Sequence, residues 1–333
     1  MINYFFRRFI FIIIVMFAVL VIIFFGSRYL PGDPIALWVG DHPTQEQIDN
    51  ARQDLGLDQN MFRQFIEYSK KLLAGDMGIS LRTHQPVKEE LTRRFFATFE
   101  LVTASIILAI IIGFPLGLYS ATQKGKPIDK IIKGFAYLNI SFPIFWMGMI
   151  LQILFFGKLG WFPLQGRLSN YEDGGFETDI ITLNSLLSGN WTVLADGLWH
   201  LALPSFTMAL GVLGIIIRTT RSAMVDTMGE PYFNTFLSFG LSTEKTVYLT
   251  GYKNTLVSVT TVVGLSYGLL LGGTFLIESI FDWPGIGNYG VLSILTNDYP
   301  SIIGVTLLYA SCFVLINFII DIIYVLIDPR IRK

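Results

Sequence analysis

The sequence has little of what a metalloprotein, a disulfide-stabilised domain or a nucleotide-binding enzyme needs. Its one cysteine, Cys312, lies in an apolar run, so no internal disulfide and no cysteine-based metal cluster are expected. The three histidines, His42, His84 and His200, are scattered, which argues against a metal site and indicates no pairing of a nucleophile with a base. No Gly-x-x-x-x-Gly-Lys-[Ser/Thr] sequence is present, so this chain has no P-loop to bind a nucleotide. We therefore expect no enzyme activity, metal or cofactor in this chain.

Charged residues are also scarce. They make up 15% of the chain, against 52% hydrophobic residues, and the net charge of −1 gives no sign of nucleic-acid binding. The mean hydropathy is +0.56. Several apolar runs approach or exceed the roughly 20 residues that a helix needs to cross the hydrocarbon core of a bilayer. The composition predicts an all-α polytopic protein surrounded by membrane lipid.

Six transmembrane helices are predicted, at about residues 9–25, 99–121, 134–156, 200–217, 256–277 and 302–327. The first run follows Arg7 and Arg8, as a signal peptide would. It is long for a signal peptide, however, and no small-residue cleavage site follows, so we interpret it as a retained span. Pro143 lies inside the third run and is expected to kink that helix.

The polar segment 31–98 predicts a small helical domain outside the membrane. Thr44 and Gln47 form a capping-box pattern that opens a helix ending near Gly56, and a second helix is expected from about 59 to 73. Residues 158–199 and 281–300 are expected to form two further outer loops. The predicted organisation is a first span over 1–30, an outer helical domain over 31–98 and a five-span core over 99–333.

The distribution of basic residues predicts the orientation. The N-terminal end, the turn at 124–133, the stretch 218–253 and the C-terminal tail together hold about thirteen Lys and Arg. The second and third outer loops hold only Lys158 and Arg167. Because basic loops stay in the cytoplasm, both termini and the stretch 218–253 are predicted to be cytoplasmic.

The stretch 218–254, between the fourth and fifth spans, contains a short apolar helix that is too short to cross a membrane. Pro231 suits the first turn of a helix and Gly240 the position just past its end. Tyr232, Phe233, Phe236, Leu237 and Gly240 fall near one another at helical spacing. Three interpretations stay open from spacing alone: the helix lies on lipid headgroups, packs on the protein's own core, or docks to another protein.

A few polar residues within or beside the apolar runs are candidates for a pathway or a gate. Asp321 lies deep in the last run and suits a proton relay or a structural hydrogen bond equally. Glu278 lies near the end of a span, which favours solvation of its carboxylate. The sequence from Phe281 to Gly287 contains Trp283, Pro284 and Gly285 and predicts a rigid turn at the membrane surface, with its aromatics at the interface. Such a turn suits a gate or a cap on two helices.

Short motifs along nearly the whole chain match a known family in order. The first are Leu30-Pro31-Gly32-Asp33-Pro34, Leu55-Gly56-Leu57-Asp58-Gln59, Gly75-Asp76-Met77-Gly78-Ile79-Ser80, Thr98-Phe99-Glu100-Leu101, Gly160-Trp161-Phe162-Pro163 and His200-Leu201-Ala202-Leu203-Pro204. The last third adds Arg218-Thr219-Thr220-Arg221-Ser222, Gly240-Leu241-Ser242, Phe281-Asp282-Trp283-Pro284-Gly285-Ile286-Gly287, Asp298-Tyr299-Pro300 and Asp328-Pro329-Arg330-Ile331-Arg332. Through them the chain resembles the permeases of ABC importers of the oligopeptide, dipeptide and nickel type, in particular the first of the two permeases that such systems carry.

The resemblance implies a function and partners. It implies a permease that moves substrate inward by alternating access in a bacterial or archaeal cell membrane, with peptides as substrate and nickel or a metal chelate as the alternative. It implies a second related permease in a heterodimer, two P-loop ATPase subunits that bind ATP and Mg, and an external binding protein that docks on 33–94. The short cytoplasmic helix becomes the coupling helix that contacts the ATPase, with Gly229, Glu230, Pro231, Tyr232, Phe233, Phe236, Leu237, Gly240 and Leu241 as its residues.

The chain departs from the family pattern in this helix. Relatives carry small and basic residues before the loop glycine, whereas this chain reads Asn234-Thr235-Phe236-Leu237-Ser238-Phe239 before Gly240. A proline that is usual after the loop is replaced by Ser258. We therefore expect a more apolar contact with the ATPase than is typical. Two functions of other classes remain as alternatives, an ion-coupled secondary transporter and a non-transporting membrane scaffold.

Overall fold

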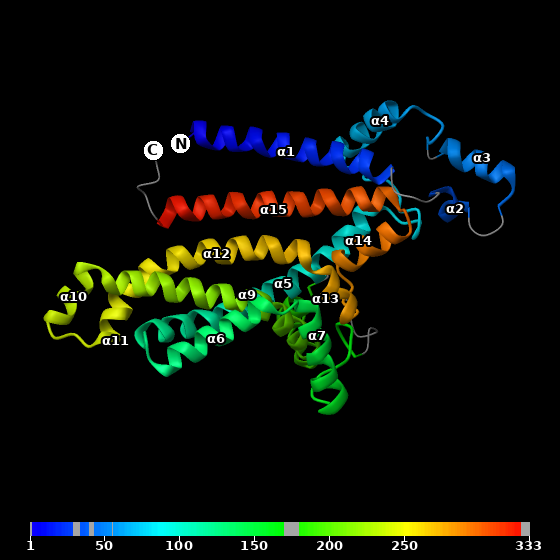
Figure 1. The fold of residues 1–333 in the computed structure, drawn as a ribbon. Helices are drawn as coiled ribbons and strands as arrows, with labels where there is room; N and C mark the ends of the chain where they lie inside the picture. The colour runs from blue at the N-terminus through cyan, green and yellow to red at the C-terminus, as the bar shows by residue number, and fades with distance from the viewer. Residues whose placement is uncertain (1, 29–33, 40–42, 55, 170–179, 328–333) are drawn as a thin grey trace. The chain divides into compact units, whose positions relative to one another are not determined.

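The computed structural model describes residues 2–28, 34–39, 43–54, 56–169 and 180–327 (Figure 1). Apart from one antiparallel bridge between Ile79 and Pro86, the regular structure in these ranges is helical. The elements are α1 (Ile2–Arg28), α2 (Pro34–Val39), α3 (Gln45–Asp54), α4 (Met61–Leu73), α5 (Val87–Thr122), α6 (Pro127–Ser141), α7 (Ile144–Gln152), η1 (Ile153–Lys158), α8 (Ile181–Ser188), α9 (Trp191–Gly229), α10 (Pro231–Ser238), α11 (Thr243–Thr246), η3 (Val247–Gly251), α12 (Tyr252–Gly273), α13 (Phe275–Ile280), α14 (Ile286–Leu295) and α15 (Tyr299–Ile327).

Five helices are long and apolar enough to cross a membrane, and a bent pair makes a sixth candidate. The five are parts of α1, α5, α9, α12 and α15, and the pair is α6 with α7 and η1. The all-helical class and the membrane-spanning character are confirmed. The exact number of spans depends on whether the bent pair crosses as one unit.

The break between α6 and α7 is much sharper than the predicted kink. The two helices are bent by 101°. Phe142 (ψ 137°) and Pro143 (ψ 129°) are both extended, so the helix stops for two residues. Proline has no N–H to donate and disfavours the α conformation in the residue before it, which explains why α6 ends at Ser141. Pro115 and Pro204, by contrast, stay inside α5 and α9.

The helices extend beyond several of the predicted spans and into the predicted loops. α5 starts at Val87, so the helix of the second span begins well before the hydropathy rises at Phe99. The second predicted loop contains α8 and the first turns of α9, and the third contains α14. The fifth predicted span is divided between α12 and α13. Hydropathy marks the limits of the apolar segment, whereas backbone hydrogen bonding continues into polar sequence, so the two boundaries differ.

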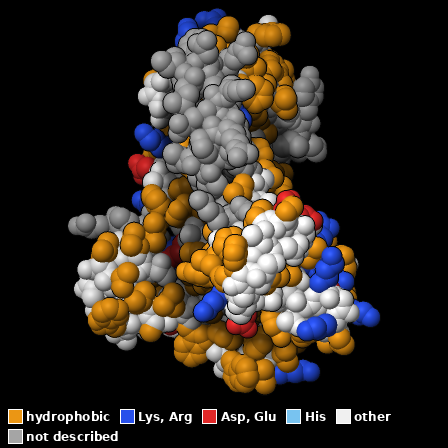
Figure 2. All heavy atoms as spheres, turned by 90° about the vertical axis from the view of Figure 1, so that its left-hand side faces the viewer, with side chains coloured by type: hydrophobic (Ala, Val, Ile, Leu, Met, Phe, Trp, Pro, Cys, Tyr) orange, Lys and Arg blue, Asp and Glu red, His pale blue; other side chains and the backbone are white. Residues whose placement is uncertain are grey.

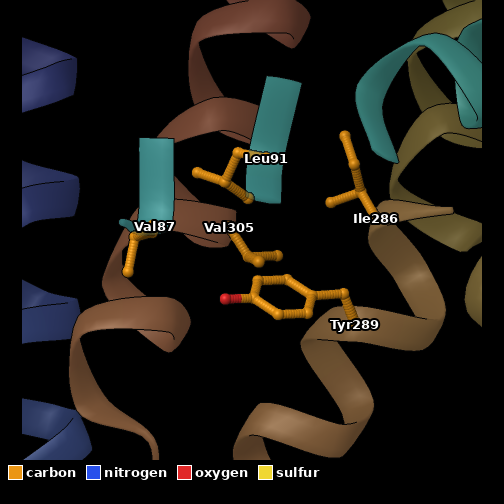
Figure 3. Close-up of a cluster of buried hydrophobic side chains, with 5 residues drawn as sticks. All are labelled: Val87, Leu91, Ile286, Tyr289 and Val305. Atoms are coloured by element: carbon orange, nitrogen blue, oxygen red, sulfur yellow. The ribbon is translucent and has the colours of Figure 1, made fainter. Parts of the chain in front are cut away.

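The chain divides into two compact units, residues 1–98 with 284–314, and residues 99–283 with 315–333. In the first unit, α1 packs along α15 through Leu20, Phe24, Ile303 and Leu307, and α4 covers this cluster. A second cluster joins the start of α5 to α14 and α15, as Figure 3 shows: Val87, Leu91, Ile286, Tyr289 and Val305. The capping box is confirmed, since the N–H of Thr44 donates to Gln47 Oε1 (2.8 Å) and the N–H of Gln47 donates to Thr44 Oγ1 (3.3 Å).

The second unit is built around α9, whose apolar stretch is 78% buried. Glycines allow its neighbours to approach closely. A Cβ atom on Gly117 of α5 would lie 2.5 Å from Thr220 Cβ, and one on Gly214 would lie 2.4 Å from the carbonyl oxygen of Ala136 in α6. Gly113 and Gly117 form a Gly-x-x-x-Gly pair, an arrangement that lets membrane helices pack backbone to backbone.

Candidate functional site

The short helix between α9 and α12 is present as α10, with the predicted ends. Pro231 occupies its first turn and Glu230 is its N-cap residue in an extended conformation. At the other end Gly240 has a φ of +83°, and the N–H of Leu241 donates to the carbonyl of Phe236 (3.3 Å). A left-handed glycine with this hydrogen bond is a common way to end a helix, and a residue with a Cβ would be strained there.

One face of α10 packs on the protein itself. Phe233 is only 2% exposed and clusters with Ala121 at the end of α5 and Met224 of α9. Leu237 and Val247 pack against the same cluster. Two of the predicted coupling residues, Phe233 and Leu237, are therefore anchors that hold α10 against the second unit.

The other face of α10 is open. Gly229, Glu230 and Pro231 are exposed, Tyr232 is 38% exposed, and Phe239 is 78% exposed. Phe236 and Leu241 are half-buried, and Tyr248 and Leu249 of the neighbouring η3 are exposed as well. Figure 2 looks onto the side that carries α10 and α11 and shows hydrophobic side chains among Lys and Arg. The buried Phe233 thus fixes the helix to the protein, while exposed apolar side chains remain beside it.

A buried ion pair joins α6 to the part of α9 that leads to α10. Asp129, at the start of α6, is fully buried, and Arg221 of α9 donates to it from Nε (2.7 Å) and Nη2 (3.0 Å). Ser120 Oγ (2.7 Å) and the backbone N–H of Gly125 (3.0 Å) donate to the same carboxylate. The pair ties the turn between α5 and α6 to α9, about three helical turns before the start of α10. Sequence reasoning missed it, because its members are far apart in the chain.

A second buried carboxylate, Glu100 of α5, organises the segment before α9. Arg167 forms an ion pair with it through Nη2, and Thr182 donates to it from its backbone N–H (2.9 Å) and its hydroxyl (2.6 Å). The guanidinium of Arg167 also lies 5.4 Å from the ring centroid of Trp283. Glu100 was quoted only as part of a motif, and nothing in its spacing pointed to these partners.

The predicted pathway or gate residues differ from expectation. Glu278 is fully buried, so the solvation predicted for it is wrong. Phe281 and Trp283 are each 1% exposed, so they are enclosed in protein and do not lie at a lipid interface. The N–H of Trp283 donates to the carbonyl of Glu278 (2.8 Å), which closes the turn after α13.

The remaining candidates are partly described. Pro284 is half-buried and Gly285 is buried; Gly285 is the N-cap residue of α14. The boundary between the two compact units falls between Trp283 and Pro284. Asp321 lies within α15, but its side chain is outside the described residues. Within the described residues, no group of three His, Cys, Asp or Glu could hold a metal ion.

Two family models match consecutive parts of the chain. The inner membrane component of binding-protein-dependent transport systems matches residues 113–333, and the N-terminal part of such membrane components matches residues 1–105. The chain belongs to this family of inner membrane transport components. The permease is thus the membrane subunit of an ABC importer and a multi-pass protein of the bacterial inner membrane. Its family is that of the membrane component, which is not itself the ATPase.

Full-length relatives support the same assignment. The permease is 40% identical over 323 residues to the probable D,D-dipeptide transport system permease protein DdpB of Escherichia coli, which covers 97% of this chain and 95% of the relative. It is 36% identical over 333 residues to the di/tripeptide transport system permease protein DppB of Pseudomonas aeruginosa (100% and 99%). It is 35% identical over 332 residues to the glutathione transport system permease protein GsiC of Escherichia coli (100% and 99%).

Proposed function

We propose that α10 is the coupling helix through which an ATPase subunit drives the permease. The observation that carries the proposal is that Phe233 of the helix is buried, whereas Phe239, the C-cap residue that follows the helix, is 78% exposed. A buried anchor lets the helix transmit a displacement to α5 and α9, and an exposed aromatic is a typical anchor for a protein partner. The surface is more apolar than the family's basic pattern, so this contact depends less on charge.

We further propose the assembly and topology of the importer. The bent pair α6–η1 counts as one span, so the chain has six spans with both termini and α10 in the cytoplasm. A second related permease completes the pathway in a heterodimer, and two ATPase subunits bind on the cytoplasmic side. An external binding protein docks on the helical segment 33–94.

Short peptides are the substrate class that the relatives support best. The names of the three relatives refer to D,D-dipeptides, to di- and tripeptides and to glutathione, which are all small peptides. Import of nickel or a metal chelate is the alternative within the same kind of complex. Uptake of labelled dipeptides and of radioactive nickel by cells with and without this chain separates the two.

The proposed mechanism is alternating access. Closure of the ATPase pair on ATP moves α10, and because Phe233 packs beside Ala121 and Met224, the movement reaches the ends of α5 and α9. A conformational change needs contacts that differ between two states, and a docked helix supplies them. Glu278, Trp283, Pro284, Gly285 and Asp321 remain proposed pathway or gate residues.

The test is copurification from the native membrane. Phe236→Glu places a charge at a half-buried position of α10, and Phe239→Glu places one on the exposed C-cap residue. Gly240→Glu adds backbone strain at a positive φ. Lys124→Glu is the matched control, because it also introduces a glutamate on the predicted cytoplasmic side of the membrane, in the turn between α5 and α6. We expect the ATPase subunits to accompany the wild type and the control and to be lost from the α10 variants, since a desolvated charge at an interface is costly.

Three outcomes would count against parts of this proposal. Equal retention of the ATPase in all variants would remove α10 as the docking site. Uptake that resists ATP depletion but stops with ionophores would favour an ion-coupled transporter. An unchanged uptake of every tested substrate in cells lacking the chain would favour a scaffold.

A further inference from the structure

The first compact unit contains a cavity of about 320 Å³ beside α1 and α15. Its lining combines apolar and charged side chains. Leu57, Ile79, Leu81 and Ile303 supply apolar surface, and the charged lining residues are Arg28, Lys71 and Asp76. Ligand sites in proteins are commonly concave, mostly apolar and equipped with a few polar groups, and this volume lies in their range.

Arg28 is the central cation of this cavity. Its Nε donates to Gln64 Oε1 (3.2 Å) and its Nη1 to the carbonyl of Phe24 (3.1 Å), and both acceptors are neutral. The guanidinium lies 3.5 Å from the ring centroid of Phe24. Within the described part of the chain no carboxylate pairs with Arg28. A guanidinium carries five donor hydrogens, so this one retains donors for an anion.

Tyr68 adds a second donor in the same lining. Its hydroxyl oxygen is buried and has no hydrogen-bond partner among the described residues. Burial raises the pKa of Tyr68 above its ordinary value, with Arg28 opposing the shift, so the phenol stays protonated. A buried hydroxyl without a partner is unfavourable, so an occupant that accepts a hydrogen bond from Tyr68 is favoured.

The position of the cavity decides what kind of anion it suits. Arg28 is the last residue of the candidate span Ile10–Arg28, and Tyr299 is the first residue of the candidate span Tyr299–Ile319. Both line the cavity. The ends of membrane-spanning helices lie at the headgroup level of the bilayer, where phospholipid phosphates are concentrated and acyl chains begin. The mixed lining matches such an amphipathic ligand.

We propose that this cavity binds the phosphate of an acidic phospholipid at the ends of α1 and α15. Arg28 and Lys71 attract the phosphodiester, and Tyr68 donates to it. The apolar lining beside Ile303 accepts the first carbons of an acyl chain. The site would hold α4 and the loop at Gly78 against the two spans, and it depends only on insertion of the chain into a membrane.

The test measures lipid retention on the full-length chain, purified with the subunits that accompany it and reconstituted in nanodiscs. The nanodiscs contain equal parts of dioleoyl phosphatidylglycerol and dioleoyl phosphatidylcholine, and native mass spectrometry reports which lipid stays bound. We expect phosphatidylglycerol to be enriched on the wild type. Arg28→Gln and Tyr68→Phe should each lower its retention about tenfold, the effect of losing a charge-assisted hydrogen bond. Lys70→Gln, next to Lys71 on α4 but outside the cavity lining, is the matched control and should leave retention unchanged.

Tyr68→Phe keeps the test decisive if Arg28→Gln fails to fold. It removes one oxygen and retains the ring that packs 5.8 Å from Phe24. A merely structural hydroxyl would change the melting temperature of the delipidated chain without changing lipid selectivity. Equal retention of the two lipids by the wild type, or unchanged retention in both variants, overturns the proposal. Displacement of the lipid by millimolar glycerol 1-phosphate would assign the site to a soluble phosphate and would overturn the lipid as its ligand.

Discussion

The ion pair between Asp129 and Arg221 gives the sharpest test of how the region below α10 is held together. Asp129 has no exposed surface and Arg221 is 19% exposed, so either charge alone would be left largely desolvated. Removing one member of a buried pair typically costs about 3–5 kcal/mol. We expect Asp129→Asn to lower the free energy of unfolding by an amount at the lower end of this range, because the amide oxygen still accepts a hydrogen bond from Ser120 or Gly125. Arg221→Gln should cost about as much, since the carboxylate then loses two donors.

A double-mutant cycle measures the coupling. The free energy of unfolding is obtained from SDS titration of the purified chain, followed by tryptophan fluorescence. Asp129→Asn combined with Arg221→Gln should lose about 1–3 kcal/mol less than the sum of the single losses, because the neutral pair leaves no stranded charge. Lys133 lies 3.4 Å from Asp129 but is 37% exposed, so Lys133→Gln should cost less than about 1 kcal/mol. Strict additivity, or an equal loss in Lys133→Gln, would refute the argument that burial gives this pair its weight.

The structure makes three further predictions. Gly117→Val should prevent α5 from packing on α9, because even a Cβ atom would lie 2.5 Å from Thr220 Cβ. The variant should therefore appear as an aggregated peak in size-exclusion chromatography. Gly272→Val is the control and should not aggregate, because no atom outside its own helix lies within 4 Å of a Cβ atom at that position. Asp298→Ala should lower the melting temperature of the chain by several degrees, since Ser80, Leu81 and Ser301 all donate to that buried carboxylate; an unchanged melting temperature would contradict this. Glu100→Gln should increase proteolysis near Thr182, because the ion pair with Arg167 is lost; protection equal to the wild type would count against it.

Local signals in the sequence predicted much of the secondary structure. The capping box at Thr44 and Gln47 opens α3, and Pro231 and Gly240 bound α10 as expected, because caps and turn glycines act within a few residues. Pro143 correctly marked a disturbance in the third run. Its size was underestimated, since whether a proline bends a helix or ends it depends on the packing of both halves.

Burial could not be read from the same signals. Glu278 lies near the end of an apolar run, yet it is fully buried, and Phe281 and Trp283 are enclosed in protein. Hydropathy describes the preference of a segment for lipid or water and does not distinguish lipid from a neighbouring helix. The coupling role of α10, the domain limits and the role of Asp321 stay predictions.

The sequence by itself determined the class of this protein. Apolar runs long enough to cross a bilayer and few charges define a polytopic helical membrane protein, because these properties depend on segment length and residue type alone. The resemblance to a permease rested on the ordered family motifs and not on composition. Only the tertiary structure decided which side chains act together. Helical spacing groups the aromatics of α10, but the position of α5 and α9 makes Phe233 an anchor and leaves Phe239 exposed. Asp129 and Arg221 are 92 residues apart, and only the packing of α6 on α9 brings their opposite charges into one buried pair.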